Sequence, residues 1–351
     1  MKLDDITSLV RENVQSLKPY RSARDDFQEG ILLDANENSF GAPFDEAAGL
    51  NRYPDPYQKK LRTLISNYRS VAVDHVFTGV GSDEAIDLLI RVFCEPGSDH
   101  IITTPPTYGM YNVAASVNNV EVREVLLTDE FQPDVSAILE QANARSKILF
   151  LCSPNNPTGN VMEQESVKIL LKEFAGIIVV DEAYIDFAEQ DSLSRWVEKY
   201  PNLVVTQTLS KAFGLAGIRL GIAIADPKII GYLMKIKAPY NVNTLTSTMA
   251  CKAFDNIGQV QKNIAAIIEE RGKLEQHLRA MPGIKKIYPS DANFLLFRVA
   301  GARKVYRQLA EKGVIIRYRG DEPRCDECLR VTVGTPEQNI RFINALNEIH
   351  S

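Results

Sequence analysis

The chain has 351 residues, which is more than one compact core usually serves, so two domains are expected. With 45% hydrophobic residues, 24% charged residues and a mean hydropathy of −0.15, the composition is that of an ordinary globular protein. The net charge of −5 argues against a nucleic-acid partner, and no apolar run approaches the roughly 20 residues that cross a bilayer, which argues against a membrane protein.

The first 45 residues have loop character and are predicted to form an N-terminal arm that joins the smaller domain. The opening stretch, MKLDDITSLVREN, carries acidic residues in its first turn and lacks the apolar core of a signal peptide. We therefore expect a cytoplasmic protein.

From about residue 75 to 225, short apolar runs alternate with stretches of helical spacing. Runs that are apolar on both faces indicate strands of a largely parallel sheet with helices on both sides, an α/β fold. In the helix predicted at 82–93, Ser82 and Asp83 take the N-cap and first-turn positions. The predicted strands are 76–81, 100–106, 147–152, 176–181, 202–208 and 219–225.

The last hundred residues have a different pattern, which predicts an α+β unit packed beside the large sheet. Thr335 and Pro336 open the final helix, at its N-cap and first position. We place the large domain at 46–245 and the small domain at 246–351. The other small-domain elements are predicted helices at 258–281 and 302–312 and predicted strands at 293–299, 314–319 and 329–334.

The cysteines do not indicate a metal centre. Cys325 and Cys328 form a single C-x-x-C, whereas a structural zinc site needs a second pair or suitably spaced histidines. We interpret them as two cysteines in a loop before a strand, and no metal is predicted.

Two residues at strand ends suggest cofactor chemistry. Asp181 ends the apolar strand in VVDEAY, where a carboxylate either caps a loop or serves a ligand at the carboxyl edge of the sheet. Thirty residues later, Lys211 lies in a polar loop between hydroxyls and glycines, with Arg219 eight residues beyond. A lysine beside a phosphate clamp, with an acid on the neighbouring strand, matches the needs of pyridoxal 5'-phosphate (PLP).

Motifs in register along the chain resemble the PLP-dependent aminotransferases of fold type I, and in particular the histidinol-phosphate aminotransferase branch. The resemblance covers nearly the whole chain. It implies a large domain with a mostly parallel seven-stranded sheet, plus a smaller α+β domain built from the two termini. The motifs are KPYRSARDD (18–26), DANEN (34–38), NRYPDP (51–56), GVGSDE (79–84), PPTYGMY (105–111), SPNNPTG (153–159), VVDEAY (179–184), TLSKAFGLAGIR (208–219) and CLRVTVGT (328–335).

The resemblance also implies roles around the cofactor ring. Lys211 resembles the lysine that binds the PLP aldehyde and shuttles a proton, and Asp181 the partner of the ring nitrogen. Tyr184 and Asn156 match the residues that contact the ring's 3-oxygen. Tyr108 matches the aromatic residue that stacks on the ring.

A second group is implied for the cofactor phosphate. GVGSDE fails as a dinucleotide-binding fingerprint because Glu84 takes the third glycine position, but a helix N-terminus still offers amides to a phosphate. Tyr53 resembles a tyrosine that crosses a dimer interface, which implies a homodimer with shared sites. The residues implied at the phosphate are Ser82, Asp83, Thr208, Ser210, Arg219 and Tyr53.

The substrate residues are implied less directly. Arg330 lies in the otherwise apolar strand LRVTVG, where an unpaired arginine is costly, so an anion is expected there. Arg317, Tyr20 and Asn36 match family positions near the substrate. The nearby Arg319 and Arg324 have solvated loop charge as an equal alternative.

The predicted reaction is PLP-dependent transamination between L-histidinol phosphate and 2-oxoglutarate, in histidine biosynthesis. Two alternatives share much of the motif set: L-threonine-O-3-phosphate decarboxylase of cobalamin synthesis, and a broad aromatic amino-acid aminotransferase. A PLP-sensing transcription regulator would need a DNA-binding module ahead of DANEN, where this sequence has only 33 residues.

Overall fold

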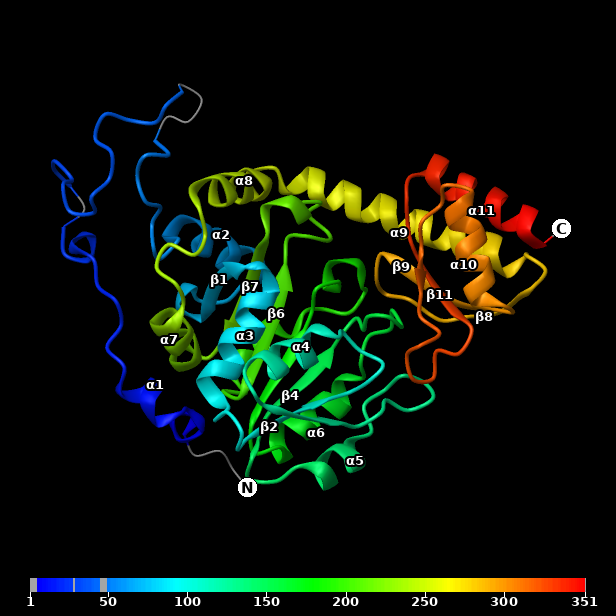
Figure 1. The fold of residues 1–351 in the computed structure, drawn as a ribbon, viewed down its shortest axis with the longest axis horizontal. Coiled ribbons are helices and arrows are strands. Elements are labelled where there is room, and N and C mark those ends of the chain that lie inside the picture. Colours follow the sequence, from blue (N-terminus) through cyan, green and yellow to red (C-terminus); the bar gives the residue numbers. More distant parts are fainter. Residues whose placement is uncertain (1–4, 28, 45–48, 351) are drawn as a thin grey trace.

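A computed structural model of the chain describes residues 5–27, 29–44 and 49–350. Figure 1 shows the N-terminal arm at one end of the molecule, the large sheet in the middle and the small domain at the other end. The predicted boundary between the arm and the large domain, at residues 45 and 46, lies outside the described residues. No helix of the described chain is long and apolar enough to cross a membrane.

The large domain contains the predicted seven-stranded sheet. In spatial order the strands are β1 (Val76–Val80), β7 (Leu220–Ala225), β6 (Leu203–Thr208), β5 (Ile177–Asp181), β4 (Ser146–Cys152), β2 (His100–Thr103) and β3 (Glu121–Glu124). Strand β7 runs antiparallel to both of its neighbours, β1 and β6, and all other neighbouring strands are parallel.

The alternation of side chains along β5 shows why the sheet is covered on both faces. Ile178 and Val180 pack into a core with α2 (Lys59–Arg69), whereas Ile177 and Val179 pack into a separate core with α3 (Gly81–Phe93). The first core also includes side chains from α5 (Val135–Gln141), α6 (Gln164–Glu173) and α8 (Thr244–Asp255), and the second from α4 (Met110–Val117) and α7 (Pro227–Ile236).

The small domain is a four-stranded antiparallel sheet with helices on one face. One side of this sheet, including Leu329 and Val331, packs against the helices, and the other side, including Leu296, belongs to the large-domain core. The Thr335 cap predicted for the last helix is present, since Gln338 N donates to Thr335 Oγ1 at 3.4 Å. The elements are α9 (Ile257–Arg279), β8 (Ile284–Ile287), β9 (Phe294–Val299), α10 (Ala302–Glu311), β10 (Arg317–Tyr318), β11 (Cys328–Thr332) and α11 (Pro336–His350).

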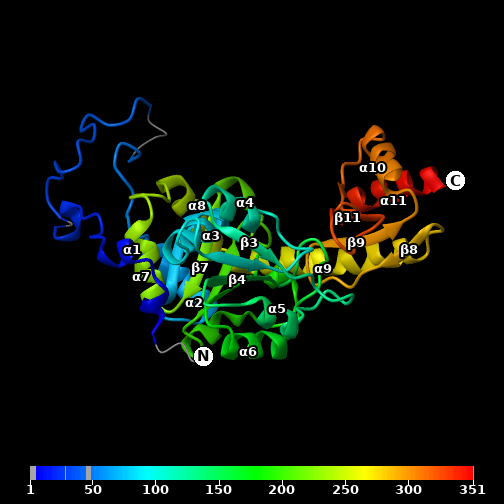
Figure 2. The same ribbon diagram turned by 60° about the horizontal axis from the view of Figure 1, so that its bottom comes forward.

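Helix α9 links the two domains. Figure 2 shows it running from the large domain out to the small one. Val260, near its start, packs in the large-domain core, and Leu274 and Leu278, near its end, pack in the small-domain core. Midway along the helix, Arg271 Nη1 donates to Ala292 O at 2.8 Å.

The described start of the arm contacts the large domain, which corrects the expectation that the arm joins the small domain. Ile6, Val10 and Val14 are buried in the core that contains α3 and α7, and their four-residue spacing is that of an apolar stripe. Arg11 Nε also forms an ion pair with Glu95 at 2.9 Å. The segment includes α1 (Glu12–Ser16).

Candidate active site

A cavity of about 130 Å³ lies at the carboxyl ends of β4, β5 and β6. Ligands of α/β folds collect at this edge of the sheet. Ten residues predicted from the sequence line it, together with Cys152, Ala183 and Ala216. These ten are Ser82, Asp83, Tyr108, Asn156, Asp181, Tyr184, Thr208, Ser210, Lys211 and Arg219.

One end of the cavity is formed by the N-terminus of α3. Amides in the first turn of a helix have no partner within the helix and favour an anion. Arg219 Nη2 lies 3.4 Å from Asp83 Oδ2, and Thr208 Oγ1 donates to Ser210 Oγ at 3.0 Å. Side-chain hydroxyls, a guanidinium and helix amides together suit a phosphate.

The strand β7 packs unusually close to this helix start. A Cβ atom on Gly221 would lie 2.0 Å from the carbonyl carbon of Gly81 and 2.1 Å from Ser82 N. Glycine is therefore required at position 221. Glu84 secures the same turn, because Val80 N and Asn241 Nδ2 both donate to Glu84 Oε2, at 2.5 and 2.9 Å.

Asp181 lines the cavity and is buried, with 3% of the residue exposed. Tyr111 Oη donates to Asp181 Oδ2 at 2.8 Å, and Ala183 N donates to Oδ1 at 3.2 Å. Burial raises the pKa of Asp181 to about 6, although these hydrogen bonds act in the opposite direction. No salt bridge to Asp181 forms within the described part of the chain.

Lys211 also lines the cavity and lies near Tyr184. Its Nζ is 5.6 Å from the centre of the Tyr184 ring. Burial lowers the pKa of Lys211, and the positive charge of Arg330 lowers it further. Both effects favour the neutral, nucleophilic amine.

The small domain reaches this site through Arg330 on β11. Arg330 Nη1 donates to Asn156 Oδ1, and its guanidinium carbon lies 4.9 Å from the centre of the Phe294 ring. Burial and the neighbouring Arg319 lower the pKa of Arg330 to about 10. Arg317 pairs with Arg330 across the β10–β11 ladder, but its side chain is exposed.

The remaining predicted residues lie elsewhere in the subunit. Tyr20, Asn36 and Tyr53 together line a second pocket of about 500 Å³ and are absent from the lining of the first. The Tyr53 ring stacks on Tyr240 with ring centres 4.6 Å apart.

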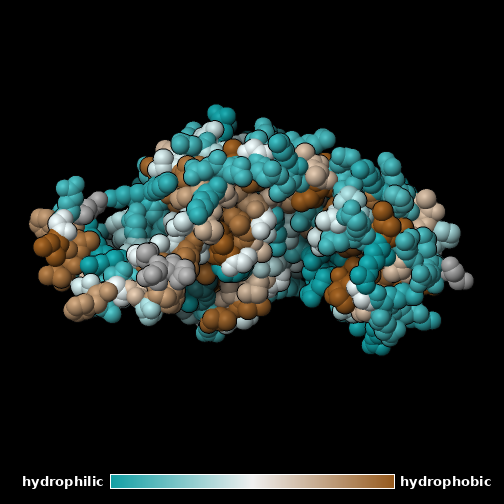
Figure 3. All heavy atoms as spheres, turned by 90° about the horizontal axis from the view of Figure 1, so that it is seen from above, coloured by the Kyte–Doolittle hydropathy of each residue, from teal (hydrophilic) through white to brown (hydrophobic). Residues whose placement is uncertain are grey.

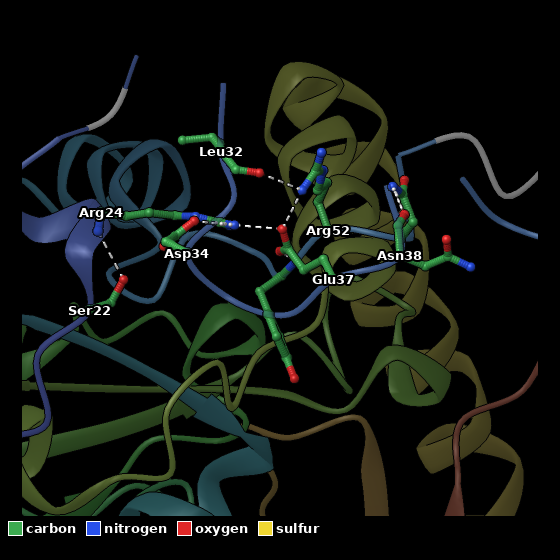
Figure 4. Close-up of polar contacts among 9 residues, drawn as sticks. Ser22, Arg24, Leu32, Asp34, Glu37, Asn38 and Arg52 are labelled. Atoms are coloured by element: carbon green, nitrogen blue, oxygen red, sulfur yellow. Dashed lines mark hydrogen bonds and ion pairs between the residues drawn. The ribbon is translucent and has the colours of Figure 1, made fainter. Parts of the chain in front are cut away.

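Glu37 organises the loop that carries Asn36. Figure 4 shows its carboxylate between the guanidinium groups of Arg24 and Arg52. The ion-pair distances are 2.6 and 2.7 Å, and Tyr53 N donates to Glu37 Oε1 at 2.7 Å. These contacts, with Arg24 first, lower the pKa of Glu37 to about 2. The two arginines and Glu37 thus fix the backbone at Tyr53.

Two residues of the site were missed from the sequence, one in the cavity lining and one that donates a hydrogen bond to Asp181. Tyr111 is fully buried, stacks on Phe150 at 4.6 Å and donates to Asp181. Cys152 ends β4 and lines the cavity. Tyr111 lies three residues after Tyr108 in PPTYGMY. In a helix this spacing places both tyrosines on one face, and that is the signal that could have indicated Tyr111.

Cys325 and Cys328 are buried in the large-domain core, and no group of His, Cys, Asp or Glu that could hold a metal ion occurs among the described residues.

Comparison with known proteins shows the family to which the chain is related. Residues 23–346 match the model of the family described as aminotransferase class I and II. A histidinol-phosphate aminotransferase from Flavobacterium johnsoniae is 51% identical, with 99% of each chain covered, and one from Christiangramia forsetii is 50% identical, with 100% of each covered. The solved histidinol-phosphate aminotransferase from Sinorhizobium meliloti, in complex with pyridoxal-5'-phosphate, has a TM-score of 0.80, 22% identity and 96% coverage of each chain, which supports the fold.

The fold, the lysine and aspartate in one cavity, and the full-length matches agree with one another. The chain belongs to the class I and II aminotransferase family and, within it, to the histidinol-phosphate aminotransferases.

Proposed function

We propose that this chain transfers the amino group of L-histidinol phosphate to 2-oxoglutarate, in the synthesis of histidine. The observation that carries the proposal is the joint occurrence of Lys211 and Asp181 in one cavity of a chain about half identical, over its full length, to histidinol-phosphate aminotransferases.

The cavity residues fit PLP, the cofactor of this family. Asp181 is a buried acid without an ion-pair partner in the described chain, as expected for a group that pairs with a charged ring nitrogen. Asn156 and Tyr184 would contact the ring's 3-oxygen, and Tyr108 would cover the ring face. When bound, PLP acts as a sink for electrons released at the carbon that bears the amino group.

Lys211 would hold the cofactor and then move the proton. Its lowered pKa favours an amine that can attack the cofactor aldehyde and later take a proton from the substrate carbon. The first turn of α3, with Ser82, Asp83 and Arg219, would bind the cofactor phosphate, and Thr208 and Ser210 would add hydroxyl donors.

Arg330 would bind the anionic end of each substrate. The two half-reactions present a phosphate in one case and carboxylates in the other, and a guanidinium fork suits both. Arg317, on the paired strand, would add a contact that the phosphate uses.

We further propose a homodimer with shared sites. Tyr20, Asn36 and Tyr53 line their own pocket, so a partner subunit would be needed to bring them to the Lys211 cavity. Apolar side chains along the arm are also exposed, among them Phe27, Ile31 and Phe40 at 74%, 90% and 102%. Figure 3 shows hydrophobic residues gathered at this end of the molecule. A cytoplasmic location stays a prediction.

The test is a set of separate half-reactions. The holoenzyme is mixed with histidinol phosphate, phosphothreonine, phenylalanine or glutamate, and the cofactor spectrum is followed. We expect histidinol phosphate and glutamate each to convert the cofactor from its aldehyde to its amine form. Carbon dioxide release from phosphothreonine without conversion by glutamate would identify a decarboxylase, and equal conversion by phenylalanine an aromatic aminotransferase.

Borohydride reduction gives a second readout of the same site. Peptide mapping should find the cofactor mass on the peptide that contains Lys211, and Lys211→Ala should lose both the label and turnover. Lys235→Ala is the matched control, because Lys235 Nζ donates to Val14 O at 2.8 Å and does not line the cavity.

A further inference from the structure

The β10–β11 ladder presents three arginines on one face. Arg317 lies directly opposite Arg330, and Arg319 follows two residues later, so its side chain points to the same side. Arg319 N donates to Cys328 O at 2.9 Å, which continues the ladder beyond β10. Arg319 is therefore a diagonal neighbour of Arg330.

The surroundings of Arg319 are not those of a solvated loop charge. Its side chain is 17% exposed, half the value for Arg324 in the same loop. Its one ion pair within the described chain joins Nη1 to Glu322 Oε1 at 3.4 Å, which is long for a charge-assisted hydrogen bond. Its buried Nε has no hydrogen-bond partner among the described residues.

Arg330 also has a buried donor without a hydrogen-bond partner among the described residues. This donor is its Nε, and its Nη1 contacts a neutral amide, Asn156. The positive charge of Arg319 lowers the pKa of Arg330 and acts in the same direction on the pKa of Tyr184, which lines the cavity. Two guanidinium groups are thus held near each other, each with an unused donor. Arg330 forms no salt bridge within the described chain, and Arg319 has only the long contact with Glu322. Such an arrangement is expected where an anion binds.

We propose that Arg319 is a specificity-determining residue that acts with Arg330 to favour a phosphate monoester over a carboxylate at the substrate's anionic end. The inference rests on the proposed function and deepens it. A phosphate monoester carries nearly two negative charges near neutral pH and has three acceptor oxygens, whereas a carboxylate has one charge and two oxygens. One guanidinium serves a carboxylate, and a second adds binding that mainly the phosphate uses.

The two substrates of the holoenzyme provide the test. Arg319→Gln should raise KM for histidinol phosphate by about ten- to a hundredfold, with little change in kcat, because a charge-assisted hydrogen bond is lost. KM for glutamate should change by less than about threefold. Arg319→Lys should recover part of the loss, since it keeps the charge but not the planar fork.

Arg324→Gln is the matched control. Arg324 lies in the same loop but pairs with Asp129, so its loss should leave both KM values unchanged. Equal increases in KM for both substrates, or a fall in kcat and melting temperature with unchanged KM ratios in both Arg319 variants, would overturn the proposal and assign Arg319 to holding the loop.

Inorganic phosphate separates this inference from the proposed function. Its inhibition constant, measured against whichever amino donor the holoenzyme accepts, should rise with Arg319→Gln by a factor similar to KM. If wild type does not convert histidinol phosphate, the proposed function fails, but weakened phosphate inhibition in the variant still supports the anion site. Unchanged phosphate inhibition would contradict it.

Discussion

Asp181 illustrates a conflict between stability and function at a single residue. The folded protein buries its carboxyl group, which raises the pKa from 3.8 to about 6. A raised carboxyl pKa means that the folded state favours the neutral acid, so stability is lost as pH rises from the unfolded pKa through the folded one. Above pH 6 the buried charge costs up to about 3 kcal/mol when no cofactor pairs with it.

We therefore predict that Asp181→Asn stabilises the protein from which PLP has been removed. At pH 8 the gain in unfolding free energy should approach about 3 kcal/mol, and at pH 5 it should fall to about half, because the wild-type carboxyl is then partly protonated. Urea denaturation at the two pH values measures both. The same variant should lose most of its transaminase activity, since the ring nitrogen would lose the charged partner proposed for it.

The exposed Asp191 supplies a control for this prediction, because Asp191→Asn removes an equal charge from the surface. It should leave the unfolding free energy and the activity close to wild type at both pH values. An Asp181→Asn gain that does not vary with pH would contradict the burial argument.

Much of the residue-level site could be predicted because its members follow strands. Asp181 and Lys211 stand next to apolar runs, where a polar residue is conspicuous in the sequence. Tyr111 could not be recognised in this way, because a buried tyrosine in an apolar helix resembles an ordinary core residue. Its function in the site depends on where its hydroxyl points, which only the fold decides.

At the scale of elements, the contact of β7 with the start of α3 is the tightest near the site. Gly221→Ala would bring a Cβ atom into the backbone of Gly81 and Ser82, which cannot move aside as a flexible side chain could. We predict a loss of about 1–3 kcal/mol in unfolding free energy and weaker PLP binding, because the helix start that is proposed to offer amides to the phosphate would be displaced.

Gly217→Ala is the matched control for this prediction. No heavy atom lies within 4 Å of a Cβ built on Gly217, so urea denaturation and a spectral titration with PLP should give values close to wild type. Similar losses in both variants would show that the loop, rather than the contact with α3, is sensitive to a side chain.

The strands that escaped prediction are short and polar. β3 reads Glu-Val-Arg-Glu and lies at the edge of the sheet, and β8 reads Ile-Lys-Lys-Ile at the edge of the smaller sheet. Edge strands have one solvated side and need no apolar run, so periodicity does not reveal them. The buried strands β4, β5 and β6 were visible because apolar residues cover both faces.

At the scale of the whole molecule, the placement of the arm was the main departure from expectation. A segment of loop character carries no sequence signal for the domain that it contacts. The apolar spacing of Ile6, Val10 and Val14 predicts that these residues are buried, but not which domain they pack against. Their contact with α3 and α7 leaves the rest of the described arm extending from the large domain, as Figure 1 shows.

The proposed sharing of sites between subunits predicts complementation between two inactive variants. Tyr53→Ala and Lys211→Ala are each expected to be poorly active alone. A mixed dimer has one site with both residues intact and one site with neither, so random mixing of equal amounts should recover about a quarter of wild-type activity. Activity is measured after subunit exchange, with sedimentation analysis of the same samples. Full wild-type activity in a monomeric sample would contradict the shared site.

The continuity of α9 has a mechanical consequence. A helix of 23 residues is about 35 Å long, and this one is anchored in a different core at each end. A tilt of this helix by about 5° at its large-domain end would therefore displace its small-domain end by about 3 Å. Because the far end of α9 packs with the small-domain sheet that carries Arg330, we expect small rotations near Val260 to alter the Arg330–Asn156 contact, where we propose that the substrate's charge is bound.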